Sequence, residues 1–226
     1  MVMISELVIN QEDNENANFY LKNKGKDLYM HVIKIFQSKY KNEKKFNYQE
    51  ISSFIRYDKS LRDILFRYFA YLEENLRAKI LLKKDIAEVV KKEKKEIINI
   101  NLIQRTNLDS TSNLYFTFIK SKISFGNLVE LCVQNEILNQ AEIEDWKNLV
   151  KLRNQIMHHN LLLLKNFQQW DKAEKNIKEI KKILKLLIKY LPKKYQKGFV
   201  FTINNLVKEK KENQFTRINL GKLNYE

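Results

Sequence analysis

The chain has 226 residues, 44% of them hydrophobic and 12% aromatic, which suits one sizeable globular core and excludes a disordered chain. Its 42 lysines and arginines exceed its 27 aspartates and glutamates, giving a formal net charge of +15. The last 62 residues, 165–226, hold 16 basic and 6 acidic residues, an excess of ten. The positive electrostatic potential of such an excess attracts polyanions, so the composition favours a nucleic-acid partner. Helices coated with lysine can produce the same excess of basic residues without one.

The single cysteine, Cys132, excludes an intramolecular disulfide, and it lies in an apolar run that predicts packing over reactivity. No Cys/His cluster has metal-ligand spacing, so we expect no metal and no other cofactor. The sequence shows neither a secretory leader pattern nor an apolar run of roughly 18 residues. We therefore expect a cytoplasmic protein without membrane contact.

One proline and four glycines predict helices joined by short polar connections. In the first half of the chain we expect a loose lead over 1–16, a helix over 19–41 interrupted or entered at Gly25, and a helix over 59–84 capped by Asp58. A loop over 99–113 follows, and then a helix that Ser124 caps and that ends near 134. The remaining expected helices span 141–160, 169–191 and 197–212. The segment 59–84 has the clearest apolar stripe, formed by Leu61, Leu65, Tyr68, Phe69, Leu72, Leu76 and Ile80. No alternating pattern predicts a sheet, so the expected fold class is all-α.

The segment 152–160, LRNQIMHHN, contains the residues best suited to phosphodiester chemistry. Arg153 supplies a permanent cation with a planar donor fork for phosphate oxygens. His158 and His159 can take and return a proton near neutral pH, and Asn154 can orient either partner. An R-x4-H spacing also arises by chance, and a histidine on a helix edge often only packs.

Helix geometry places these side chains on different faces. At 100° per residue, Asn154 and His158 share a face, whereas Arg153 and His158 lie about 140° apart. Leu149, Leu152 and Ile156 form the core-facing stripe. Two copies of the chain facing each other across a two-fold axis would supply two cations and two proton carriers, so we expect a homodimer.

The motif, with Asn directly after Arg, resembles the signature of the HEPN superfamily of helical proteins, many of them metal-independent ribonucleases. Three segments narrow the resemblance to abortive-infection (Abi) proteins of the AbiD/AbiF type. These segments are YDKSLR at 57–62 leading into LEENLRAKI at 72–80, SFGNL at 124–128, and the motif at 152–160. The stretch before residue 46 departs from that family's Tyr-rich entry, of which Phe19-Tyr20-Leu21 resembles a remnant. The resemblance implies an N-terminal region at 1–45, a HEPN-like helical bundle at 46–191 and a basic helical extension at 192–226.

The resemblance also implies a bacterial anti-phage or toxin-type endoribonuclease that acts as a homodimer. His158 would act as general base on the ribose 2′-hydroxyl, and Arg153 would neutralise the phosphorane. Asn154 would orient His158 or a phosphate oxygen, and the partner's His158 or His159 would protonate the leaving 5′-oxygen. The products would carry 2′,3′-cyclic phosphate and 5′-hydroxyl ends.

Other residues support narrower expectations. Glu73 and Arg77 have the spacing of an intrahelical ion pair, and the family-like alternative brings one of them to the Arg153 site. His31 is expected to pack. The expected RNA-contacting lysines are Lys181, Lys182, Lys185, Lys189, Lys193, Lys194 and Lys197. Aromatic Tyr195, Phe199 and Phe201 could stack on RNA or pack the last helix, and packing is favoured.

Two alternatives to an unrestrained ribonuclease stay open. The first is an RNA-binding protein, without catalysis or dependent on a trigger, that forms a complex with a small structured noncoding RNA. The second is a toxin restrained by a protein antitoxin. The size of the basic C-terminal region favours an RNA partner in addition to any cleavage site.

Overall fold

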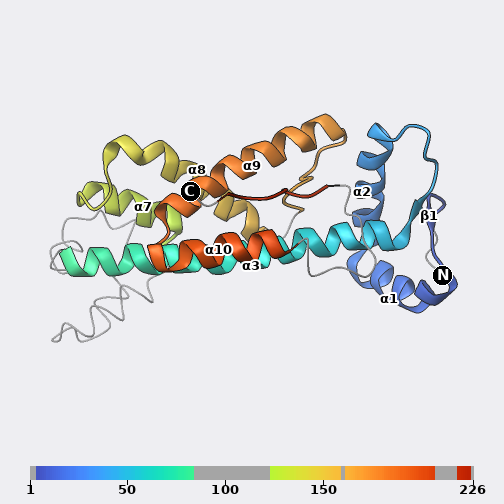
Figure 1. Cartoon of the computed structure of the whole chain (residues 1–226), viewed down its shortest axis with the longest axis horizontal. Coiled ribbons are helices and arrows are strands. Elements are labelled where there is room, and N and C mark those ends of the chain that lie inside the picture. Colours follow the sequence, from blue (N-terminus) through green and yellow to red (C-terminus); the bar gives the residue numbers. More distant parts are fainter. Residues whose placement is uncertain (1–3, 84–122, 159–160, 207–217, 225–226) are drawn as a thin grey trace.

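The computed structural model describes residues 4–83, 123–158, 161–206 and 218–224 (Figure 1). Its helices confirm the all-α expectation: α1 (Asn14–Lys24), α2 (Lys26–Lys39), α3 (Tyr48–Lys83), α7 (Phe125–Gln134), α8 (Ile143–Met157), α9 (Trp170–Tyr190) and α10 (Lys193–Asn205). Two 3-10 turns, Gln11–Asp13 and Gln140–Glu142, precede α1 and α8. Within these ranges, we find no helix with the length and apolarity to span a bilayer.

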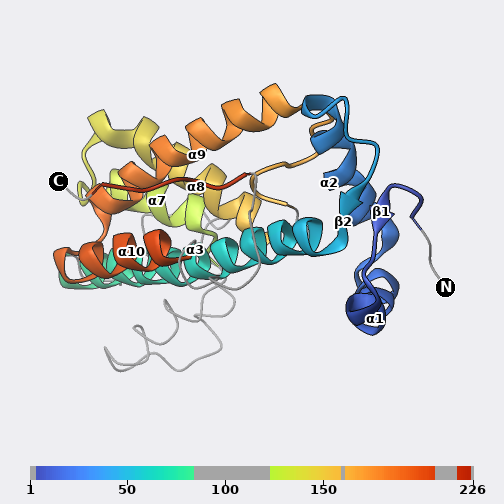
Figure 2. The ribbon, with the colours of Figure 1, turned by 45° about the vertical axis from the view of Figure 1, so that its right-hand side comes forward.

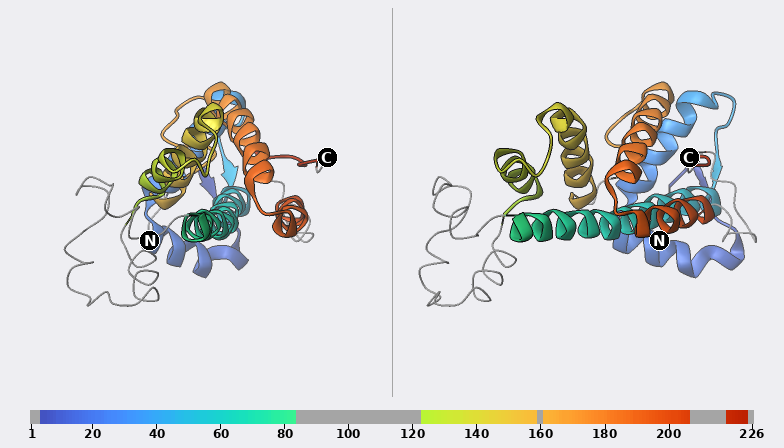
Figure 3. Two further views of the ribbon diagram at one scale, coloured as in Figure 1. Left: turned by 90° about the vertical axis from the view of Figure 1, so that its left-hand side faces the viewer. Right: turned by 60° about the vertical axis from the view of Figure 1, so that its left-hand side comes forward.

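Helix α3 is the spine of the molecule. It runs along the long axis in Figure 1, with α10 beside it and α9 crossing above. Helices α7 and α8 pack on the half of α3 that lies towards its C-terminal end, and α1 and α2 gather at the other end (Figures 1 and 3). The predicted apolar stripe of α3 is buried along its whole length, and α2, α7, α8 and α10 all pack on this helix.

Helix α3 begins at Tyr48, eleven residues before the predicted start. The predicted capping role of Asp58 is therefore wrong, because Asp58 lies inside the helix and its side chain is fully buried. The local signal that suggested a cap was an acidic residue before an apolar run. The residues upstream, Ile51, Phe54 and Ile55, are also buried and extend the same apolar face.

The N-terminal region is more ordered than the predicted loose lead. Residues Leu7–Val8 (β1) pair in parallel with Phe46–Asn47 (β2), a minimal sheet that the sequence did not predict (Figure 2). Ile4 and Leu7 are buried in the core. The predicted helix over 19–41 is two helices, and Gly25 joins them with a φ of 87°, which only glycine adopts readily.

The C-terminal region packs on the spine. Helix α10 ends at Asn205, whereas the predicted extension to 212 falls outside the described residues. Ile218, Leu220 and Leu223 are buried. The Tyr57 hydroxyl of α3 accepts a hydrogen bond of 3.0 Å from the backbone N–H of Leu220. This hydrogen bond attaches the segment 218–224 to α3. The domain limits expected at 45 and 191 stay a prediction.

Candidate functional site

Helix α8 carries the R-x4-H motif, and its core-facing side is buried. Its Leu149, Leu152 and Ile156 are buried, which confirms the predicted core-facing stripe. Opposite them, Asn154 is exposed, and the helix ends at Met157 with His158 as its C-terminal cap residue. His159 and Asn160 lie outside the described residues. Asn154 therefore lies on the outer face of α8, and His158 lies at its end.

Arg153 is held by an acidic residue from α3. A Glu73 carboxylate oxygen lies 3.6 Å from Arg153 Nη2, and the other oxygen accepts a 3.0 Å hydrogen bond from Arg77. Arg77 is buried and also donates to the backbone carbonyl of Ile123 at 3.2 Å. Both expectations for Glu73 thus hold at once, since it pairs with Arg77 within α3 and reaches Arg153 on α8.

A small pocket of about 100 Å³ lies beside this ion pair, between α3 and α8. Its lining includes Glu73, Arg153 and the aromatic ring of Phe66. Phe66 is 51% exposed, and Met157 on α8 is 38% exposed. An arginine beside exposed apolar side chains can serve both as a phosphate contact and as part of a contact surface.

No described contact joins Arg153 and His158 within one chain. His158 is exposed, and among the described contacts none joins its ring to Arg153 or to another side chain. The rotation of about 140° between the two positions on α8 explains the separation. A site that uses both residues on one phosphate needs a second copy of the chain or movement of the helix end.

Two buried side chains, Asp58 and Asn176, form a clamp that holds the segment directly after the motif. Asp58 of α3 accepts hydrogen bonds from the backbone N–H groups of Leu162 at 3.1 Å and Leu163 at 2.9 Å. Asn176 of α9 donates to the carbonyls of the same two residues, at 3.0 and 2.8 Å. All of 161–164 is buried. Since buried backbone groups need partners, these two side chains allow an irregular segment to cross the core.

Arg62 completes the clamp from the next turn of α3. Its Nε lies 3.0 Å from Asp58, whose side chain is fully buried, whereas 13% of the Arg62 side chain is exposed. Burial raises the pKa of the Asp58 carboxyl, while the two backbone N–H groups and Arg62 oppose that shift. The stretch 57–62 that carries the family resemblance therefore has a structural purpose, because Tyr57 holds the C-terminal segment and Asp58 holds the segment after the motif.

His31 of α2 holds the far end of the clamped segment. Its Nε2 lies 2.6 Å from the carbonyl oxygen of Lys165, whose φ of 48° marks a left-handed turn. Sequence reasoning predicted a packing role for His31, and the structure adds this hydrogen bond. Three elements, α2, α3 and α9, thus fix the chain within a few residues of His158.

No family model, curated protein or solved structure matches this chain. Among the described residues, no three His, Cys, Asp or Glu side chains gather as a metal site requires.

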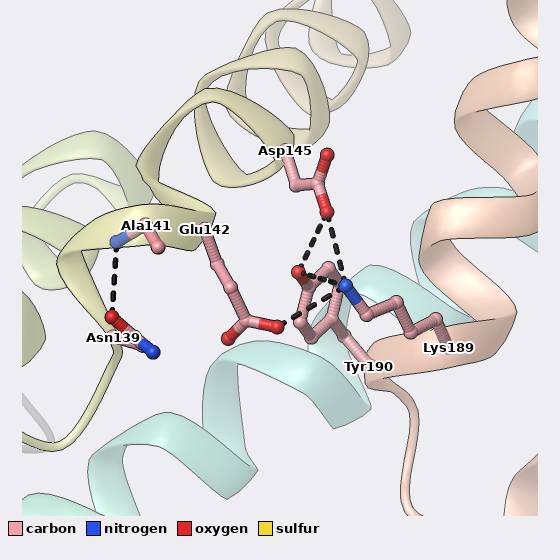
Figure 4. A network of polar contacts seen from close by, with 6 residues as sticks. All are labelled: Asn139, Ala141, Glu142, Asp145, Lys189 and Tyr190. Atoms are coloured by element: carbon pink, nitrogen blue, oxygen red, sulfur yellow. Dashed lines mark hydrogen bonds and ion pairs between the residues drawn. The ribbon is translucent and has the colours of Figure 1, made fainter.

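The predicted RNA-contacting lysines of α9 and α10 differ in their surroundings. Lys182, Lys185, Lys193, Lys194 and Lys197 are exposed, and Lys181 is half-buried. Lys189 is exposed but lies 3.1 Å from Glu142 and 3.2 Å from Asp145, and it donates to the Tyr190 hydroxyl at 2.8 Å (Figure 4). Its charge is balanced by two carboxylates, so Lys189 is the least available of the set.

The network around Lys189 joins α9 to the start of α8. The Tyr190 hydroxyl donates to Asp145 at 2.7 Å, which lowers the pKa of that carboxyl. Hydrogen bonds to Tyr190, Glu142 and Asp145 hold the pKa of Lys189 above its usual range, and burial raises the pKa of Tyr190 to about 12. The network lies on the surface and is expected to orient the two helices with little effect on stability.

We expect Lys185→Ala to lower RNA affinity and the salt dependence of binding, whereas Lys189→Ala should change neither. The two lysines lie one turn apart on α9, so both variants remove the same charge from the same face. Only Lys189 is already neutralised by neighbouring carboxylates. Fluorescence anisotropy of a labelled single-stranded RNA over a salt series tests this pair. An equal loss for both variants would show that the local ion pairs do not matter.

The aromatic residues of α10 mostly pack, as favoured from the sequence. Phe199 is fully buried and contacts Tyr68 of α3, with ring centroids 4.8 Å apart. Tyr195 stacks on Tyr71 at 4.5 Å with rings nearly parallel. Phe201 is 68% exposed and remains the only one of the three that RNA could readily reach.

Proposed function

We propose that this protein is a metal-independent endoribonuclease that works as a homodimer, with Arg153 and His158 as its catalytic residues. The observation that carries the proposal is that one helix bears both an arginine paired with Glu73 and an exposed histidine at its end. Glu73 of α3 pairs with Arg153 on the flank of α8 that faces α3, and the buried clamp fixes the chain beyond His158. The resemblance of the motif to the HEPN superfamily and to Abi proteins supports a role in bacterial anti-phage defence.

The chemistry follows from these side chains. His158 takes the proton from a ribose 2′-hydroxyl, and the oxygen attacks the adjacent phosphorus. Arg153 neutralises the added negative charge of the phosphorane, an interaction stronger in the transition state than in the ground state. A second histidine, the partner's His158 or His159, protonates the departing 5′-oxygen. The products are a 2′,3′-cyclic phosphate and a 5′-hydroxyl, and Asn154 orients His158 or a phosphate oxygen.

A homodimer explains how residues on different faces can act together. Two copies related by a two-fold axis would bring Arg153 of one chain towards His158 of the other. Phe66 and Met157, both partly exposed near Arg153, supply apolar surface for such a contact. The angle between Arg153 and His158 hinders a site within one chain, but it suits a site shared between two chains.

A substrate comparison tests the proposed reaction. A labelled RNA is compared with the same strand carrying a single 2′-deoxynucleotide at its main cleavage position, both in EDTA. The proposal expects cleavage of the RNA, loss of cleavage at the deoxy position, and products with cyclic phosphate ends. Cleavage at the deoxy position, or activity that requires a divalent ion, would contradict it.

Arg153→Lys is expected to lower the cleavage rate about tenfold to a hundredfold although the charge is kept, because lysine lacks the planar fork that can hold two phosphate oxygens. Single-turnover kinetics on a labelled RNA measures this. The matched control is Lys147→Arg, an exposed position earlier on the same helix that lines neither pocket, which should leave the rate unchanged. An Arg153→Lys variant as fast as the wild type would remove Arg153 from the catalytic assignment.

A second candidate, an RNA-binding protein held in complex with a small noncoding RNA, is favoured by the exposed lysines of α9 and α10. These cover more surface than a cleavage site requires. Purification at low salt distinguishes the candidates, since a bound RNA raises the ratio of absorbance at 260 nm to that at 280 nm. RNA that co-purifies intact and stays uncut under the cleavage conditions would favour the RNA-binding candidate.

A further inference from the structure

A cleft of about 290 Å³ lies between α8 and α9, on the opposite flank of α8 from the Arg153–Glu73 pair. Its apolar side is formed by Leu152 of α8 and by Ile180, Ile183 and Leu186 of α9. Its volume approaches the lower end of the range for small-molecule pockets, roughly 300 Å³. It therefore has room for a ligand with a flat apolar part of about the size of a nucleobase and its sugar.

Three lysines give the cleft a positive charge. Lys151, Lys165 and Lys182 line it, and Glu179 is the one acidic residue in the lining. Within the described parts of the chain, none of the three ammonium groups lies within ion-pair distance of a carboxylate. Burial and the neighbouring charge of Lys151 lower the pKa of Lys165 although Glu179 opposes them, and a bound anion would relieve this unfavourable environment for a cation.

The cleft is also lined by a buried polar side chain. Asn176 lines the cleft and is 3% exposed. Its Nδ2 is fixed by the carbonyls of Leu162 and Leu163, so the orientation of the amide is determined, yet among the described residues nothing donates to its Oδ1. The bonds to Leu162 and Leu163 hold this side chain in place, so the part of the cleft that Asn176 lines is rigid.

The position of the cleft relates it to the proposed catalytic residue. Lys151, Gln155 and His158 fall on neighbouring positions of one α8 face, with His158 one turn beyond Gln155. A strand held in the cleft by one phosphate would therefore continue towards the end of the helix that carries His158. Arg153 lies on the other flank of α8, facing α3.

We propose that the α8–α9 cleft binds one nucleotide of the single-stranded RNA substrate, its phosphate contacting Lys151, Lys165 and Lys182 and its base lying on the apolar side. The choice of RNA as the ligand rests on the proposed function. Cation groups with an adjoining apolar surface are the combination that single-stranded nucleic-acid sites use. The cleft thus serves as a positioning subsite, and none of its residues takes part in proton transfer.

The test uses binding, so that it is separate from cleavage. All proteins are full-length and carry His158→Ala, and EDTA is present. The cleft variant is Lys151→Ala with Lys182→Ala, and its matched control is Lys172→Ala with Lys178→Ala, two exposed α9 lysines that do not line the cleft. A second cleft variant, Gln155→Trp, fills the opening without changing the charge.

Anisotropy of a labelled single-stranded RNA is measured over a salt series, with uridine 5′-monophosphate and inorganic phosphate as competitors. We expect the cleft double variant to bind RNA about tenfold more weakly than the control double variant, and its salt slope to fall by about 0.7 for each phosphate that is no longer neutralised. Gln155→Trp should weaken binding as well. The mononucleotide should compete with RNA at lower concentration than phosphate, and this difference should vanish in the cleft variants.

Equal losses in the cleft and control variants would overturn the subsite, because charge alone would then explain binding. Competition by phosphate as effective as that by the mononucleotide would also overturn it, since no base would be bound. A mononucleotide that binds the cleft without affecting RNA affinity would replace the substrate role by that of a free-nucleotide site. A wild-type protein that does not cleave RNA, while these binding results hold, would refute the proposed reaction and leave the subsite intact.

Discussion

Asp58→Ala is expected to destabilise the protein by about 3–5 kcal/mol, the usual cost of breaking a buried charge pair by removing one partner. Arg62 would keep a nearly buried charge without its counter-ion, and the N–H groups of Leu162 and Leu163 would lose their acceptor. For a chain of this length, a loss of this size lowers the midpoint of thermal unfolding by roughly 10 °C. Circular dichroism on heating measures the shift.

The matched control for this variant is Asp63→Ala, on an exposed position of α3 a little over one turn later. Surface substitutions usually change stability by less than about 0.5 kcal/mol, so its unfolding midpoint should stay close to that of the wild type. Asp58→Asn keeps the size and one acceptor oxygen, and should fall between the two. Similar midpoints for Asp58→Ala and Asp63→Ala would show that the clamp does not hold the core.

Mixing Arg153→Ala with His158→Ala is expected to restore cleavage that neither variant shows alone. In a dimer whose sites combine Arg153 of one chain with His158 of the other, and in which His159 protonates the leaving oxygen, the mixed dimer contains one intact site. Random re-association gives half mixed dimers with one site of two, hence about a quarter of wild-type activity. Each single variant should lose about 10²–10⁴ in rate, so the recovery would be large against the background.

The mixing experiment requires the two proteins to exchange subunits, which co-expression with two different affinity tags secures. The control is a mixture of Arg153→Ala with the double variant Arg153→Ala, His158→Ala, which contains no complete site in any arrangement. Recovery in the first mixture alone would establish the shared site. A purified mixed dimer without activity would place both residues in one chain or remove one of them from catalysis.

Periodicity predicted the helices well because their apolar stripes are local. The stripe of α3, the core face of α8 and the Ser124 cap of α7, which accepts a hydrogen bond from the N–H of Asn127, all follow from residues within a few positions of one another. The start of α3 was missed for the same reason. An aspartate before an apolar run has the local pattern of a cap, and only the fold shows that Asp58 bonds to residues more than a hundred positions away.

In the candidate site, too, local sequence predicts some features, whereas others depend on how the helices pack. The motif on α8 was recognisable from spacing, and the ion pair of Glu73 with Arg77 follows from an i, i+4 relation. The contact of Glu73 with Arg153, the hydrogen bond of His31 to Lys165, and the cleft between α8 and α9 depend on helix packing. Asn176, an amide in the buried stripe of a basic helix, was the one sequence signal that could have indicated the clamp.

The central claim is that His158 performs metal-independent cleavage of RNA. The most direct test is incubation of a labelled RNA with wild type and His158→Ala in EDTA, after high salt has removed bound nucleic acid. We predict cleavage by the wild type alone, with 2′,3′-cyclic phosphate ends on the products. Equal cleavage by His158→Ala, or cleavage that EDTA abolishes, would contradict the proposed mechanism.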